Sequence, residues 1–153
     1  GDITHPVPDL TGYITEGQIV LSQELHVRGV YPPFDPLRSL SRLMRLGAGP
    51  GRTRDDHIEL AAQVYALVSL ARRSADLAEI VGLDALGPTE RAYLAFADAF
   101  EQELVTQGRL EGRTLDETLE RAWRAVSVLP PHALGMLSST ALEAHYPGGA
   151  GAR

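Results

Sequence analysis

The 153-residue sequence contains no cysteine and no lysine, and all 14 of its basic residues are arginine. Without cysteine the chain has no disulfide, no thiolate nucleophile and no thiolate metal ligand. Without lysine it has no Schiff-base amine, no lysine general base and no lysine for a phosphate-binding loop. It also lacks a run of about 20 apolar residues, which a membrane helix needs, so we expect no direct membrane insertion.

The charge balance is acidic, with a formal net charge of −6 at pH 7. An acidic chain lacks the positive surface by which proteins bind phosphate backbones, so we expect no nucleic-acid partner. The first ten residues have neither a basic start nor an apolar core, which argues against a signal peptide. The sequence begins at Gly1 rather than methionine, which suggests a fragment or a processed chain.

Residues 1–51 are rich in proline and glycine and contain few strand signals. The apolar run 18–21 predicts a buried strand, and Ser22 is a suitable N-cap for a short helix that ends at Gly29. Three prolines within residues 31–36 exclude a helix or a central strand and leave an extended surface segment. One strand cannot satisfy its own backbone. We therefore expect this region to be the edge of a larger α/β domain, which the glycine-rich connector 47–51 joins to a second region.

Residues 52–146 show amphipathic periodicity throughout, which predicts an all-α helical bundle. A final glycine-rich segment, 147–153, predicts a flexible tail. The helix boundaries come from capping residues, glycines and prolines. The first predicted helix begins at a capping box of Thr53 and Asp56, and a second, short helix runs from Ser74 to Gly82. A third helix runs from Pro88 to Gly108, and a fourth begins at a capping box of Thr114 and Glu117 and ends at Pro130. The last predicted helix carries Leu134, Leu137, Ala141 and Leu142.

Most candidate sites have an ordinary structural explanation. The segment Gly51-Arg52-Thr53 resembles the end of a phosphate-binding loop, but arginine stands at the lysine position and the preceding stretch is helix-like, so a linker is favoured. No two of the five histidines have the i, i+4 spacing of a helical zinc site. Trp123, Tyr93, Phe96 and Phe100 are spaced as core residues. Arg38, Arg42 and Arg45 form a solvated charged face or contact a phosphate on a neighbouring protein, and the pattern alone does not choose.

A long resemblance favours the second of these interpretations. The segment 1–19, GDITHPVPDLTGYITEGQI, resembles the signature of V/A-type ATPase B subunits. So do Tyr31-Pro32-Pro33, the segment from Ser39 to Leu43, and the stretch 51–57. The resemblance is dense to about residue 60 and looser beyond it. It implies that residues 1–51 end a central nucleotide-binding domain, and that residues 52–146 are the C-terminal helical bundle.

The resemblance also implies a function. B subunits of this family are non-catalytic, and ATP or ADP with Mg binds at their interface with the catalytic A subunit in an alternating hexamer. The fragment would bind no cofactor and no metal by itself. It would contact the central rotor stalk and help couple ATP turnover to ion transport in a complex that is cytoplasmic and peripheral on the membrane.

Arg42 resembles the arginine finger that reaches the nucleotide of the A subunit. Tyr31, Pro32, Pro33, Ser39 and Ser41 would support its loop, and the prolines would restrict it at lower ordering entropy. Arg38 stands where the family usually has proline, so two arginines flank the Ser-Leu-Ser core, and the register favours Arg42. Two alternatives remain: an F-type or secretion-type relative, which the Thr4–Ile14 segment argues against, and a stand-alone helical adaptor derived from such a subunit.

Overall fold

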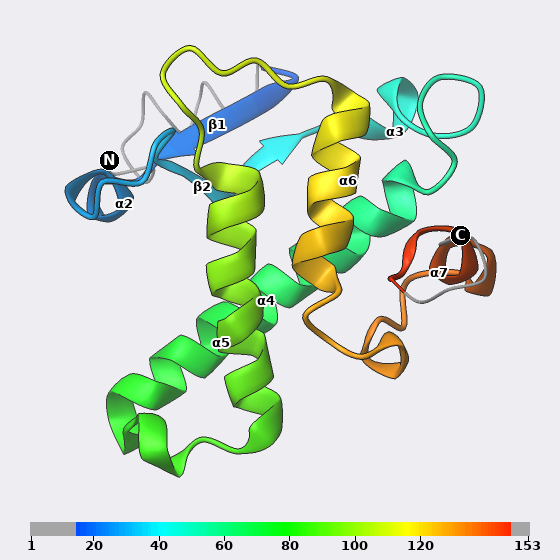
Figure 1. Cartoon of the computed structure of the whole chain (residues 1–153). Helices are drawn as coiled ribbons and strands as arrows, with labels where there is room; N and C mark the ends of the chain where they lie inside the picture. The colour runs from blue at the N-terminus through cyan, green and yellow to red at the C-terminus, as the bar shows by residue number, and fades with distance from the viewer. Residues whose placement is uncertain (1–14, 148–153) are drawn as a thin grey trace.

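The computed structural model describes residues 15–147 as a two-stranded ribbon placed at one end of a helical domain (Figure 1). This is the mixed architecture that the sequence predicts. In chain order the elements are β1 (Gly17–Leu21), α2 (Gln23–Val27), β2 (Phe34–Ser41), α3 (Met44–Gly47), α4 (His57–Val81), η1 (Leu83–Ala85), α5 (Pro88–Phe100), η2 (Glu101–Val105), α6 (Leu115–Val126), η3 (Pro131–Ala133) and α7 (Ser139–His145).

The ribbon contains one strand more than the sequence analysis expected. β1 pairs antiparallel with β2, with Gly17 opposite Ser41 and Leu21 opposite Phe34. β2 includes Pro36, which is tolerated because the ribbon has a free edge where no backbone donor is needed. The prediction of a buried strand at 18–21 is wrong on burial, since only Val20 is buried in β1. The stretch that carries Arg38 was also expected to be helix-like. This prediction is wrong up to residue 41, because residues 34–41 form strand β2.

Helix α4 is a single helix of 25 residues, where the sequence predicted two. Ser74 does not begin a new helix but lies buried inside α4. No proline or glycine interrupts residues 57–81, so nothing forces a break there. Gly82 ends the helix as predicted: it has a φ of 85°, and its N–H donates to the carbonyl of Ala78.

The predicted capping box at Thr53 and Asp56 is wrong. Asp56 is the N-cap residue of α4, but its side chain makes no capping hydrogen bond. The hydroxyl of Thr53 instead accepts from the N–H of Gly49 at 2.8 Å. This bond closes the glycine connector into a turn, and Gly49 has a φ of 107° that favours glycine.

Of the later helix boundaries, the predicted starts of α5 and α6 are confirmed, whereas the predicted ends lie at other residues. Pro88 begins α5 at its first position, and Thr114 with Glu117 forms the predicted capping box of α6. The α5–η2 helix ends at Val105, before Gly108. Arg113 binds that end, since its guanidinium donates to the carbonyls of residues 103, 104 and 106. A side chain from further along the chain therefore satisfies the carbonyls that a helix leaves free.

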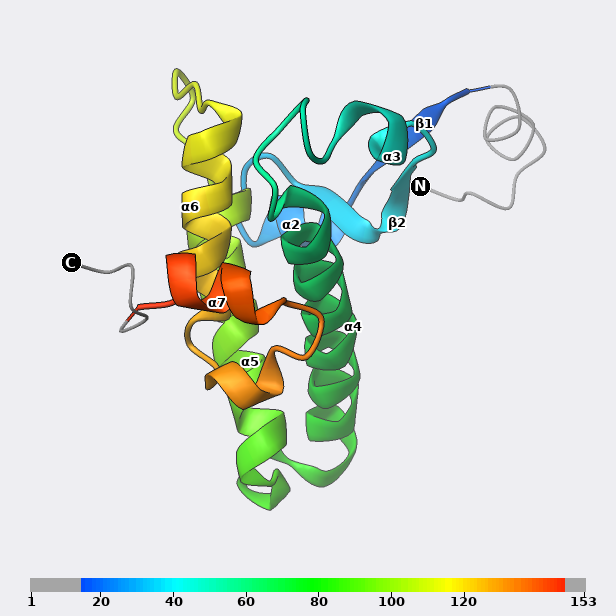
Figure 2. The same ribbon diagram turned by 90° about the vertical axis from the view of Figure 1, so that its right-hand side faces the viewer.

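The last two helices are shorter than predicted. α6 ends at Val126, and Ser127 is its C-cap. Leu134 and Leu137 lie before α7, which begins only after Ser138, whose hydroxyl accepts from the N–H of Ala141. α7 lies across the bundle (Figure 2). The carbonyl of Leu129 accepts from the hydroxyl of Tyr146 at 3.1 Å. Of the predicted tail 147–153, only Pro147 lies within the described residues.

The core lies between α4, α5, α6 and the chain around α7. The predicted aromatic set belongs to it: Trp123 and Phe96 are buried, and Tyr93 and Phe100 pack against them half-buried. Across the described range 15–147, no helix combines the length and apolarity required to cross a bilayer.

A buried carboxylate joins the start of α4 to this core. Asp56 accepts two hydrogen bonds from Arg54, at 2.6 and 2.7 Å, and one from the indole N–H of Trp123 at 2.6 Å. Arg54 also pairs with Glu120, and the ring of His145 stacks on Trp123 with 5.4 Å between centroids. Burial alone would raise the pKa of Asp56, but the bonds from Arg54 and Trp123 outweigh it and hold that pKa below its usual range.

This lowered pKa predicts acid sensitivity. A carboxyl whose pKa is lower in the folded state stabilises the fold above its unfolded pKa, near 4, and loses that contribution as pH falls through the lower folded value. We expect the free energy of unfolding to decrease below about pH 4. In the Asp56→Asn variant the free energy of unfolding should decrease less between about pH 5 and 2, because the titrating carboxyl group has been removed. Urea unfolding at a series of pH values, followed by the fluorescence of the single tryptophan, measures the difference.

If the free energy of unfolding fell equally with pH in Asp56→Asn and in the unmodified chain, Asp56 would not be the source of the acid sensitivity. In both proteins the free energy of unfolding should still depend on pH, because Glu111 and Glu117 are surface groups whose pKa values are also lowered. The pKa of Glu111 is lowered by a hydrogen bond from Arg113, and that of Glu117 by the backbone N–H of Thr114.

Candidate functional site

Arg42 leaves the ribbon at the end of β2. Its backbone N–H donates to the carbonyl of Glu16 at 2.8 Å. Its guanidinium donates through Nη1 to the carbonyl of Thr15 at 3.1 Å, and the residue is exposed. Both bonds go to the segment just before β1. The neighbouring chain segment therefore holds both the backbone of Arg42 and one nitrogen of its guanidinium, in a residue that lies at the surface.

A β-bulge sets the position of β2 relative to β1. The pairing shifts register between Gln18 and Val20. There the hydroxyl of Ser39 accepts from the N–H of Val20 at 3.0 Å and donates to the carbonyl of Asp35 at 2.6 Å. A slip of one residue would turn every side chain of a strand to the opposite face. Ser39 thus fixes where the end of β2, and Arg42 after it, leaves the ribbon.

Asp35 supports the same bulge from within. Its buried carboxylate accepts from the N–H groups of Leu37 at 3.0 Å and Arg38 at 3.3 Å. It also lies 3.8 Å from the guanidinium of Arg72 on α4. Asp35 is not among the site residues that the sequence predicts. The available signal was the Asp35-Pro36 pair, because aspartate before proline favours a turn closed by its own side chain.

The structure brings some of the predicted support residues to Arg42 and leaves others apart. Ser39 and Ser41 lie on β2 just before it, and Ser41 pairs with Gly17. Arg38 also lies on β2, four residues before Arg42, and is exposed.

Tyr31, Pro32 and Pro33 lie at the opposite end of β2. An eight-residue strand separates them from Arg42, or roughly 25 Å at the usual rise. The carbonyl of Pro33 accepts from the N–H of Ser22, and that of Tyr31 accepts from the N–H of Gln107. The peptide between Tyr31 and Pro32 is cis. These residues therefore anchor the start of β2, and any support they give to Arg42 passes through the strand.

The other candidate groups make structural contacts. A ring nitrogen of His57 lies 3.0 Å from the hydroxyl of Thr53 and forms a hydrogen bond with it. Thr53 is the threonine of the segment that resembles a phosphate-binding loop. That segment follows α3 rather than a strand. Nowhere in residues 15–147 do three histidine or acidic side chains come close enough together to hold a metal ion.

Two family models match the chain in sequence. Residues 1–41 match the nucleotide-binding domain of the ATP synthase alpha/beta family. Residues 46–146 match the C-terminal domain of V and A type ATP synthase. The second match covers about two thirds of the chain.

Curated relatives are similar over nearly the whole chain. The B subunit of an A-type ATP synthase from Aeropyrum pernix is 52% identical over 146 residues, which are 95% of this chain and 32% of the relative. A V-type ATP synthase beta chain from Anaeromyxobacter dehalogenans is 59% identical over 143 residues, 94% of this chain and 30% of the relative. The chain thus spans about a third of the length of these relatives.

A solved structure is similar in fold. The unique ATP synthase subunit NeqB from Nanoarcheaum equitans superposes with a TM-score of 0.77 at 42% sequence identity. The similarity covers 86% of this chain and 34% of that one.

Proposed function

The chain belongs to the V/A-type ATP synthase family, with B subunits as its relatives, and on this premise we propose that it is the end of a non-catalytic B subunit that completes a nucleotide site in trans through Arg42. The ATP or ADP, with its Mg, would be held at the interface with the catalytic A subunit of an alternating hexamer. This chain would contribute one cation to that site.

The observation that carries the proposal is the anchoring of Arg42. The carbonyl of Glu16 accepts from its backbone N–H and the carbonyl of Thr15 accepts from its guanidinium, while the residue stays exposed at the end of β2. A preorganised cation next to a transferring phosphoryl group stabilises charge that develops in the transition state. Arginine suits the role because its permanently charged, planar fork can hold two oxygens at once.

The residues of this chain suit a supporting rather than a catalytic role. Phosphoryl transfer by a phosphate-loop enzyme needs a loop lysine, and none of the 153 residues is lysine. Magnesium in such sites is held by carboxylate, hydroxyl and phosphate oxygens. The carboxylate of Asp35, on the strand that Arg42 follows, does not offer such oxygens, because it is buried and accepts from backbone N–H groups.

The rest of the proposal concerns the assembled machine. The helical domain would contact the central rotor stalk and so help couple ATP hydrolysis or synthesis to ion transport. The complex would lie in the cytoplasm and be peripheral on the membrane, attached through its other subunits. Support comes from the match of residues 46–146 to the C-terminal domain of V and A type ATP synthase.

A reconstitution experiment tests the non-catalytic role. We expect the full-length subunit alone to hydrolyse ATP at the background rate, and its complex with the A subunit to hydrolyse ATP at a typical enzymatic rate, about 1–10³ per second. The matched control is the A subunit with a B subunit that ends before residue 1 of this chain. Hydrolysis by the isolated B subunit, at a rate near that of the complex, would contradict the proposal.

A further inference from the structure

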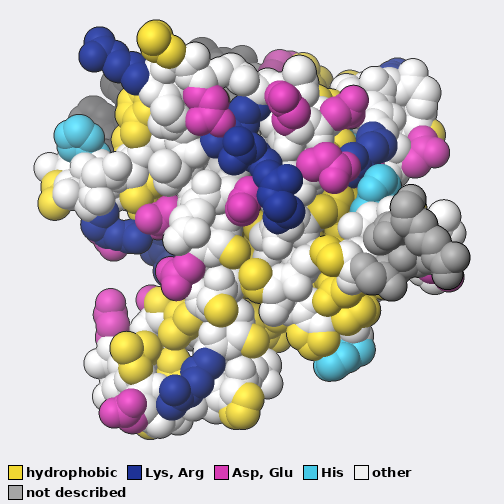
Figure 3. Space-filling view, in the orientation of Figure 1, with side chains coloured by type: hydrophobic (Ala, Val, Ile, Leu, Met, Phe, Trp, Pro, Cys, Tyr) yellow, Lys and Arg dark blue, Asp and Glu magenta, His cyan; other side chains and the backbone are white. Residues whose placement is uncertain are grey.

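A groove lies where the ribbon meets the helical hairpin of α4 and α5. It has a volume of about 370 Å³ and is bordered by α2, the start of β2, α4, α5 and η2. Figure 3 shows the molecule hollowed on its left side, between the ribbon region and the lower end of the hairpin. Of the residues placed above around Arg42, only Asp35, which supports the bulge of β2, lines this groove.

The floor of the groove is apolar. Leu25 and Phe34 line it from the ribbon side, and Val68, Leu94 and Phe100 line it from the helices. Apolar floors of this kind take up the hydrophobic face of a ligand or of a partner segment.

The rim of the groove carries excess negative charge. Five carboxylates line the groove, of which that of Asp35 is buried, against two guanidinium groups. Both cations are already paired, Arg28 with Glu101 at 2.8 Å and Arg72 with Asp35 at 3.8 Å. Three carboxylates are left, those of Glu24, Asp76 and Glu79, which have no side-chain partner among the described residues.

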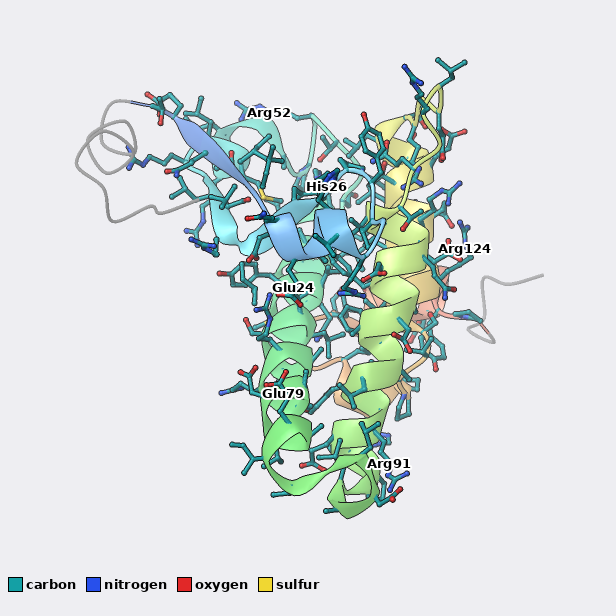
Figure 4. All side chains as sticks on the ribbon, turned by 90° about the vertical axis from the view of Figure 1, so that its left-hand side faces the viewer. Glu24, His26, Arg52, Glu79, Arg91 and Arg124 are labelled. Atoms are coloured by element: carbon teal, nitrogen blue, oxygen red, sulfur yellow. The ribbon has the colours of Figure 1, made fainter. Side chains whose placement is uncertain are left out.

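The three carboxylates stand on two sides of the groove. Glu24 comes from α2, whereas Asp76 and Glu79 follow one another along α4 at the spacing of one helical turn. Figure 4 shows Glu24 and Glu79 on the same side of the molecule, with α2 above this part of α4. An occupant would thus meet negative charge along both edges and apolar side chains between them.

From this arrangement we infer that the groove binds an amphipathic helix of another subunit, with its apolar face on the floor and arginine or lysine residues one turn apart against Asp76 and Glu79. Helix-in-groove binding of this kind uses apolar anchors at i, i+3, i+4 and i+7. Strand addition fits less well, because Pro36 at the groove offers no backbone donor. The inference rests on the proposed function only in placing the partner within the same complex.

Photo-crosslinking of the assembled complex tests the inference. The photoreactive residue p-benzoylphenylalanine replaces Ala75, which lines the groove, in the full-length chain, and the crosslinked peptide is sequenced by mass spectrometry. The matched control places the same residue at Ala62, which is exposed on α4 outside the groove. We expect the Ala75 site alone to yield a peptide of another subunit that carries basic residues three or four positions apart.

Charge reversal provides the second measurement. Asp76→Arg together with Glu79→Arg should lower the crosslinking yield about tenfold, because like charges then face each other. Asp98→Arg with Glu143→Arg, which reverses two exposed charges outside the groove, should leave the yield unchanged. If the Ala75 variant does not assemble, Glu24 on the opposite rim takes the photoreactive residue.

Three results would overturn the inference: a crosslink within the same polypeptide, a crosslink to a peptide without basic residues, or none at either groove position in an assembled complex. ATP turnover measured in the same preparation keeps this result separate from the proposed function. Turnover that depends on Arg42 without a groove crosslink refutes only the groove partner. A groove crosslink with turnover indifferent to Arg42 refutes only the finger.

Discussion

Arg42→Ala in the full-length subunit is expected to lower the ATP turnover of the A/B complex by roughly 10³- to 10⁵-fold. The removed guanidinium would stabilise charge on the transferring phosphoryl group, and this loss corresponds to roughly 4–7 kcal/mol of barrier. Steady-state turnover at saturating ATP measures it. Arg42→Lys should recover little, because a lysine ammonium is a point charge without the two-pronged geometry.

Arg38→Ala is the matched control for this prediction. Arg38 is an exposed arginine on β2, four residues before Arg42, and its backbone N–H donates to the carboxylate of Asp35. We expect its removal to change turnover little. Assembly of both variants is checked by size-exclusion chromatography. If Arg38→Ala abolished turnover and Arg42→Ala did not, the other arginine would be the finger. If neither mattered, both would belong to a charged surface.

Asp56→Ala is expected to lower the free energy of unfolding by about 3–5 kcal/mol, the usual cost of removing one partner of a buried ion pair. The substitution leaves the half-buried guanidinium of Arg54 and the buried indole N–H of Trp123 without their shared acceptor. Thermal and urea unfolding of the 153-residue chain, observed through Trp123, measures the change. The fluorescence should respond directly, since Asp56 bonds to the reporting ring.

Asp55→Ala is the control for this second prediction. Asp55 is an aspartate at the same helix start, but it is exposed. Its removal should change the free energy of unfolding by no more than about 0.5 kcal/mol, as is usual for surface positions. Equal effects of the two substitutions would indicate that the helix dipole, rather than the buried network, accounts for the stabilisation.

Local signals in the sequence predicted several helix ends correctly. Ser22, Pro88, Gly82 and the Thr114–Glu117 pair each act within four residues of their own position. Such interactions are complete once the neighbouring residues are known. Ser74 failed as a signal because a serine inside a helix and a serine at its start look alike when burial is unknown.

The candidate site was predicted from resemblance rather than from chemistry. The three arginines between residues 38 and 45 do not differ in type, and the strand that carries Arg38 depends on pairing with a segment about twenty residues earlier. The role of Asp35 and the bulge at Ser39 follow from that pairing. The groove between α2 and α4 brings together Glu24 and Glu79, which are more than fifty residues apart in sequence.

The sequence by itself determined the composition-based exclusions, the order of an α/β edge followed by helices, the local caps and, through resemblance, the family. The tertiary structure alone decided that β2 exists, that Asp56 binds Arg54 and Trp123 instead of capping α4, and that Thr15 and Glu16 hold Arg42. The physical reason is the range of the interactions. Caps and stops are satisfied within one helical turn, whereas strand pairing, buried ion pairs and grooves join residues far apart in the chain, whose meeting depends on how the whole core packs.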